Sequence, residues 1–133
     1  MATARQWISG ARPRTLPAAI TPVAVGTGAA FPNPRFATAG LALLVALALQ
    51  IGVNYSNDYS DGIKGTDDNR VGPFRLVGSK SASPRAVLLV AIAMFLIAAI
   101  SGLTLAAMIT WWLIPVGIAA IAAAWGYTGN CRA

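Results

Sequence analysis

The stretch LALLVALALQIGVNYSNDYSD, residues 41–61, joins a long apolar run to a polar end without a break. Its first part suits a helix in lipid, because a bilayer core takes about 20 apolar residues per helix. The four acidic residues of the chain all lie in the polar end or just after it: Asp58, Asp61, Asp67 and Asp68. Polar groups at the end of a membrane span are costly and by default indicate function. The stretch therefore predicts a membrane helix that ends in a functional site.

The rest of the chain is also apolar. Hydrophobic residues make up 56% of it and charged residues 11%, against about a quarter of charged residues in soluble domains. Uncharged runs cover 15–34, 36–57 and 86–131. The third would be a helix about 69 Å long at 1.5 Å per residue, so we expect it to turn near 107–112 and form two spans. A soluble bundle is the alternative, and little polar surface remains to cover one.

We therefore predict an all-α, polytopic transmembrane bundle. The expected spans are 16–31, 36–59, 84–107 and 111–127, with a loop over 60–84. Ser83 is expected to cap the third span, with Pro84 at its first position. The segment around Trp7, between arginines, is typical of a helix on the membrane surface, and Trp111 and Trp112 are typical of an interfacial anchor.

The basic residues predict the orientation, because Lys and Arg mark the cytoplasmic side of a membrane protein. Three precede the first span and five lie between the second and third, whereas only Arg35 lies between the first two. Both termini and the acidic loop should therefore face the cytoplasm, in a multi-pass protein of the plasma membrane. The net charge of +6 fits attraction to anionic headgroups. Nucleic-acid binding is not indicated, since no basic stripe interleaved with aromatic residues occurs.

The polar end of the second predicted span has helical spacing. Residues three, four and seven apart share a helix face, so Asn54, Asn57, Asp58 and Asp61 are expected to project as one stripe, which Lys64 extends. Amide and carboxylate oxygens suit a hard cation, and magnesium usually takes one or two carboxylates plus substrate phosphates.

The residues after this stripe complete the expected site. Gly62 and Gly65 should let the chain leave the helix and bring Asp67 and Asp68 back toward it. The basic residues Lys64, Arg70, Arg75 and Lys80 are placed to receive phosphate oxygens. Together these groups predict a metal–diphosphate site. A solvated loop of mixed charge is the alternative, but it leaves Asn54 and Asn57 unexplained, and a calcium EF-hand fails because its ligands fall out of register.

Several motifs resemble a known family. NDYSDGIKGTD (57–67) and RLVGSKSASPRAV (75–87) resemble the first aspartate-rich motif of the UbiA-type intramembrane prenyltransferases. RPRTLPAAITPVAVGTGAA (12–30) and AWGYTG (124–129) resemble its branch that prenylates 1,4-dihydroxy-2-naphthoate in menaquinone synthesis. The resemblance implies a bundle of nine spans around a cavity open to lipid. It also implies Mg²⁺-dependent transfer of a polyprenyl group from polyprenyl diphosphate to 1,4-dihydroxy-2-naphthoate, with loss of CO2.

The resemblance also implies roles for individual residues. Asn57 and Asp61 match the metal-ligand pair of the motif, with Asp58 between them, and catalytic roles are expected for Asp61 and Asp58. Asp67 is the third candidate metal ligand, because Gly65 stands where the general pattern has an aspartate. Lys64, Arg70 and Arg75 are the candidates for binding diphosphate, and Asn54 completes the polar stripe.

The family has a second aspartate-rich motif on a later loop, whereas Asp68 is the last acidic residue here. We therefore expect residues 1–133 to be the N-terminal portion of one prenyltransferase domain, from a truncated or frame-shifted reading frame. The alternative is a non-catalytic membrane fragment or half-module.

Overall fold

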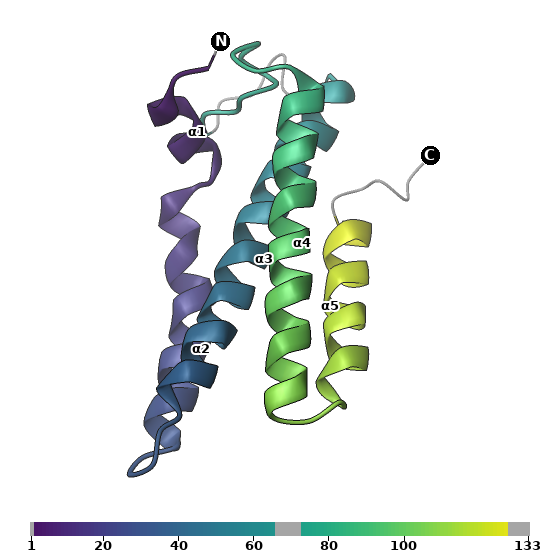
Figure 1. Cartoon of the computed structure of the whole chain (residues 1–133). Helices are drawn as coiled ribbons and strands as arrows, with labels where there is room; N and C mark the ends of the chain where they lie inside the picture. The colour runs from purple at the N-terminus through teal and green to yellow at the C-terminus, as the bar shows by residue number, and fades with distance from the viewer. Residues whose placement is uncertain (1, 66–72, 128–133) are drawn as a thin grey trace.

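The computed structural model describes residues 2–65 and 73–127, and all regular structure in these residues is helical (Figure 1). The α-helices are α1 (Ala4–Gly10), α2 (Leu16–Ala29), α3 (Phe36–Ile63), α4 (Pro84–Met108) and α5 (Leu113–Tyr127), and a 3-10 helix, η1 (Pro13–Thr15), joins α1 to α2. The predicted all-α class is thus confirmed for the described residues.

Each of the four predicted apolar spans contains a helix, but the helices differ in length. By length and composition, α3 and α4 are able to cross a membrane. The helices α2 and α5 have 14 and 15 residues, about 21 and 23 Å at 1.5 Å per residue, which is shorter than a hydrocarbon core of about 30 Å. The turn between α4 and α5 falls at residues 109–112, as predicted.

The helix α3 runs further than the predicted span 36–59. It continues to Ile63, and the backbone N–H of Lys64 donates to the carbonyl of Ser60 at 3.3 Å. Gly62 therefore lies inside the helix, contrary to its predicted part in the chain's exit. The exit falls at Gly65, whose φ of 66° lies in the left-handed region that glycine adopts without strain. The polar end is helical as far as Ile63.

The helices α2 to α5 run alternately up and down, and the main interhelical packing is that of α3 on α4 (Figure 1). Gly52 allows this packing to be close, since a Cβ on it would lie 3.1 Å from Cε1 of Phe95. Ala48, Ser56 and Ser60 continue the same four-residue spacing and are buried. Small residues of this kind let membrane helices approach one another.

Large apolar side chains cover an outer face of α4. Leu89, Leu96, Ile100 and Leu103 are all exposed, and their spacing places them on one side of the helix. Such a face is costly in water and favourable against lipid. Trp111 and Trp112 are exposed in the turn between α4 and α5, at the place predicted for an interfacial anchor.

A small core forms at the end of the bundle where α3 finishes and α4 begins. Its buried residues are Tyr55, Leu76, Val77, Val87 and Ala91, and Trp7 of α1 packs against them. The start of α4 is capped as predicted: Ser83 Oγ accepts the N–H of Ala86 at 3.3 Å, and Pro84 is the first helical residue. This core brings α1, α3 and the segment 73–83 together around the polar end of α3.

Candidate active site

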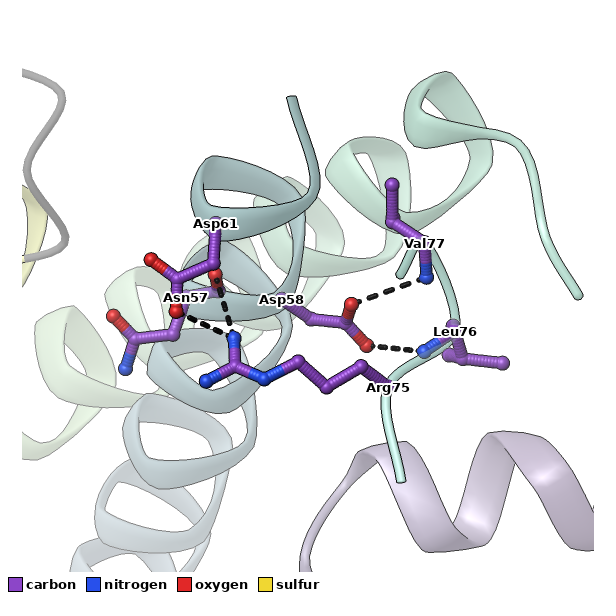
Figure 2. Close-up of polar contacts among 6 residues, drawn as sticks. All are labelled: Asn57, Asp58, Asp61, Arg75, Leu76 and Val77. Atoms are coloured by element: carbon purple, nitrogen blue, oxygen red, sulfur yellow. Dashed lines mark hydrogen bonds and ion pairs between the residues drawn. The ribbon is translucent and has the colours of Figure 1, made fainter. Parts of the chain in front are cut away.

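The polar end of α3 does not present one stripe, contrary to our prediction. Asn57 and Asp61 point to one side of the helix, whereas Asp58 points away from them toward Leu76 and Val77 (Figure 2). Asp58 is turned away because its two oxygens bind the backbone N–H groups of Leu76 and Val77, while Asp61 binds the side chain of Arg75. The polar end therefore presents two faces with different surroundings.

The first face pairs an acid with a base. Nη1 of Arg75 donates to Oδ2 of Asp61 at 2.5 Å and to the backbone carbonyl of Asn57 at 3.4 Å (Figure 2). The Asp61 side chain is 33% exposed and that of Arg75 12% exposed. The carboxylate can thus be reached from outside while the arginine is held nearly in the interior. An acid, an amide side chain and a guanidinium lie together here.

The second face is buried. Asp58 is 2% exposed, and its Oδ2 accepts the backbone N–H of Leu76 at 2.7 Å while its Oδ1 accepts that of Val77 at 3.1 Å (Figure 2). The positive charges of Arg75 and Arg12 also act on this carboxylate. Both oxygens are therefore directed at the protein's own backbone.

Asn54 belongs to this second face. Its Nδ2 donates to the carbonyl of Ala11 at 2.8 Å and to Oγ1 of Thr15 at 3.0 Å. The hydroxyl of the next residue, Tyr55, donates to the carbonyl of Trp7 at 2.7 Å, and the two rings meet edge to face with centroids 5.7 Å apart. These bonds tie the N-terminal segment to α3, so Asn54 lies in the attachment of α1 and η1.

The remaining predicted site residues are only partly described. Lys64 is exposed at the end of α3, whereas Asp67, Asp68 and Arg70 lie outside the described residues. Within 2–65 and 73–127, no group of three His, Cys, Asp or Glu side chains is placed to hold a metal. Asn57 and Asp61 still fit magnesium, because an amide and a partly exposed carboxylate one helical turn apart are oxygen donors of the kind that it takes with substrate phosphates.

Most of the chain matches one protein family. The model of the UbiA prenyltransferase family matches residues 16–132, which is most of the chain. The chain belongs to the UbiA prenyltransferase family. This agrees with the resemblance of the motif at 57–67, and it identifies the fold as that of an integral membrane protein.

Two relatives from mycobacteria match almost the whole chain. The chain is 58% identical over 99% of its length to the 1,4-dihydroxy-2-naphthoate octaprenyltransferase of Mycobacterium tuberculosis, and 56% identical over 99% to that of Mycobacterium leprae. It is 32% identical over 90% of its length to that of Bacillus subtilis. The chain covers 46%, 46% and 39% of these relatives, respectively. It thus spans about half the length of the relatives that it matches, and no solved structure matches it significantly.

The sequence reasoning missed the acceptors and donors that come from the backbone. The N–H groups of Leu76 and Val77 bind Asp58, and the carbonyl of Asn57 binds Arg75. Backbone groups carry no sequence signal of their own. A signal is available in the side chains of Leu76 and Val77, two apolar residues in a polar loop, which prove to be buried.

Proposed function

We propose that this chain is the N-terminal portion of a prenyltransferase that transfers a polyprenyl group from polyprenyl diphosphate to 1,4-dihydroxy-2-naphthoate, with decarboxylation, to give demethylmenaquinol. The single observation that carries the proposal is the position of Arg75 against Asp61 and Asn57 at the polar end of an apolar helix. Family membership and the names of the relatives support the substrates.

In this proposal each residue of the first face has a separate part. Asn57 and Asp61 hold Mg²⁺, with Asp67 as the third candidate ligand, and Arg75, Lys64 and Arg70 bind the diphosphate. When bound, Mg²⁺ supplies charge that stabilises the departing diphosphate oxygens. Arg75 is suited to this task because a guanidinium binds carboxylate and phosphate oxygens through several N–H groups at once. In the absence of substrate, its pairing with Asp61 keeps both charges compensated.

The apolar cavity alongside α3 is suited to the polyprenyl chain of the substrate. A cavity of about 390 Å³ between α3, α4 and α5 is lined by apolar residues that include Val45, Leu49, Gly102 and Ile121. Leu49 lies eight residues before Asn57, about 12 Å along the helix axis. A polyprenyl chain whose diphosphate is at Asn57 and Asp61 would run along α3 toward this cavity. Lipid and apolar side chains exclude the water that destroys an allylic cation.

A non-catalytic membrane half-module is the second candidate. The sequence feature behind it is that all four acidic residues lie within 58–68, in a single motif. Such a module would bind one metal–diphosphate unit and pair with a further segment for catalysis.

The test is a chimera in which this chain replaces the matching part of the Mycobacterium tuberculosis relative. Membranes that contain the chimera are supplied with polyprenyl diphosphate, 1,4-dihydroxy-2-naphthoate and Mg²⁺, and demethylmenaquinol is measured. We expect product from the chimera and a loss of about 100-fold or more for Asp61→Ala and Asp61→Asn. Because Asp61→Asn keeps the shape and removes the charge, full activity in that variant would contradict the proposal.

A further inference from the structure

The two carboxylates of α3 differ in what they bind, although only three residues separate them. Asp61 accepts a hydrogen bond from the side chain of Arg75. Asp58 accepts hydrogen bonds from the backbone N–H groups of Leu76 and Val77, the two residues that follow Arg75. Three consecutive residues of the segment 73–83 are thus bound to one turn of α3. The backbone immediately after Arg75 is held by one acid, and its guanidinium is held by the other.

The packing around Asp58 makes this attachment a fixed one. Leu76 is fully buried, and Val77 packs against Gly62, where a Cβ would overlap its side chain. On the other side of Leu76, a Cβ on Gly10 would lie 2.8 Å from Cδ1 of Leu76. The segment therefore lies between α1 and α3, and its two N–H groups cannot reach water. Only an acceptor from within the protein can satisfy them.

A carboxylate is the side chain that suits this position. It offers two oxygens with acceptor sites only, so that each adjacent N–H finds a partner. The amide of an asparagine has a single oxygen, and its NH2 group would oppose the second N–H. The two oxygens of Asp58 thus hold backbone and are turned away from Asn57 and Asp61 (Figure 2).

We propose that Asp58 is a positioning residue: it fixes the backbone at Leu76 and Val77 so that Arg75 reaches the face of Asn57 and Asp61. The proposal rests on the function proposed above for that face, and it assigns Asp58 a part other than metal ligation. Asp61 and Arg75 would touch metal and diphosphate, while Asp58 acts through Arg75.

The first experiment measures the attachment without any ligand. Hydrogen–deuterium exchange of the full 133-residue chain in nanodiscs is compared between the wild type and Asp58→Asn. We expect exchange at residues 74–78 to become about tenfold faster in Asp58→Asn, because one buried backbone N–H loses its acceptor. Ser60→Ala is the matched control, because Ser60 is fully buried on the same turn and its hydroxyl has no hydrogen-bond partner within the described residues. Unchanged exchange in Asp58→Asn would overturn the proposal.

The second experiment separates positioning from metal ligation. Binding of Mn²⁺ alone is measured by electron paramagnetic resonance, and binding of inorganic pyrophosphate with Mg²⁺ by titration calorimetry. We expect Asp61→Asn to weaken Mn²⁺ binding about tenfold, whereas Asp58→Asn leaves it unchanged. Pyrophosphate should bind about tenfold more weakly to Asp58→Asn, and this loss should disappear when Arg75→Ala is also present. Equal losses of Mn²⁺ affinity in both aspartate variants would show that Asp58 is a ligand.

A conservative variant covers the case in which Asp58→Asn fails to fold. Asp58→Glu keeps both acceptor oxygens but moves them by one methylene, so exchange protection should be retained while pyrophosphate affinity falls several-fold.

The binding data also distinguish failure of the proposed function from failure of the positioning role. If Asp61→Asn and Arg75→Ala leave Mn²⁺ and pyrophosphate binding unchanged, the proposed function is contradicted. If those two variants act and Asp58→Asn and Asp58→Glu do not, the positioning role alone is overturned.

Discussion

Gly62 of α3 and Val77 of the segment 73–83 are packed backbone against side chain, and a Cβ on Gly62 would overlap Cγ1 of Val77. This contact lies one turn beyond Asp58, whose carboxylate binds the N–H of the same valine. The two contacts together place the segment on α3. Because Arg75 lies two residues before Val77, this packing also determines where Arg75 lies. The site therefore requires that position 62 have no side chain.

Gly62→Ala should destabilise the protein by about 1–3 kcal/mol, the usual cost of forcing extra atoms into a packed position. Thermal unfolding in detergent measures this. Gly102→Ala is the matched control, because its Cβ would lie at an ordinary 3.9 Å from Cγ2 of Val45 and alanine is the better helix former by up to about 1 kcal/mol. A Gly62→Ala variant that unfolds at or above the wild-type temperature would contradict the packing described here.

Arg75→Lys should raise the KM for polyprenyl diphosphate in the chimera by about tenfold, and Arg75→Gln should lower kcat/KM by about 100-fold. Lysine keeps the charge but loses the planar donor fork that lets arginine hold a carboxylate and phosphate oxygens at once, whereas glutamine loses the charge as well. Steady-state kinetics at fixed Mg²⁺ measures both. Arg35→Gln, which removes the same charge from the start of α3, should leave both constants unchanged. If the chimera with Arg75→Lys has the same KM and kcat/KM as the unchanged chimera, Arg75 does not bind the diphosphate.

The predicted topology places both termini and the 60–84 loop in the cytoplasm, with the turn at 31–35 outside. Pro34→Cys and Asp68→Cys, each made in a Cys131→Ser background, are treated on intact cells with a membrane-impermeant maleimide. We expect position 34 to be labelled directly and position 68 only after permeabilisation, because the basic residues concentrate on one side of the spans. Labelling of position 68 alone in intact cells would reverse the orientation.

The 133-residue chain made alone should insert in membranes and transfer no prenyl group. Ionisation of an allylic diphosphate depends on charge stabilisation that grows toward the transition state, and the only acidic residues of this chain lie within 58–68. Purified chain, both substrates and Mg²⁺ are compared with empty membranes, and the active chimera is the positive control. Product above the empty-membrane level that disappears in Asp61→Asn would show that one acidic motif suffices.

Much of the fold could be predicted because it depends on local properties. The apolar runs and their lengths predict the helices and a turn near 107–112, which the structure has at 109–112. Ser83 with Pro84 predicts the start of α4. Helical periodicity also predicts that Asn57 and Asp61 share a face, since a spacing of four residues is set by the helix itself. These features need no knowledge of what the chain packs against.

The different hydrogen-bond partners of Asp58 and Asp61 were decided by the tertiary structure. Both are aspartates at the end of one helix, and the local sequence predicts a single stripe for them. What separates them is the docking of a segment 14 to 19 residues further along, which brings the guanidinium of Arg75 to one face and two backbone N–H groups to the other. That docking depends on the burial of Leu76 and the room at Gly62 and Gly10. Periodicity orients a side chain, but only long-range packing determines the partner that meets it.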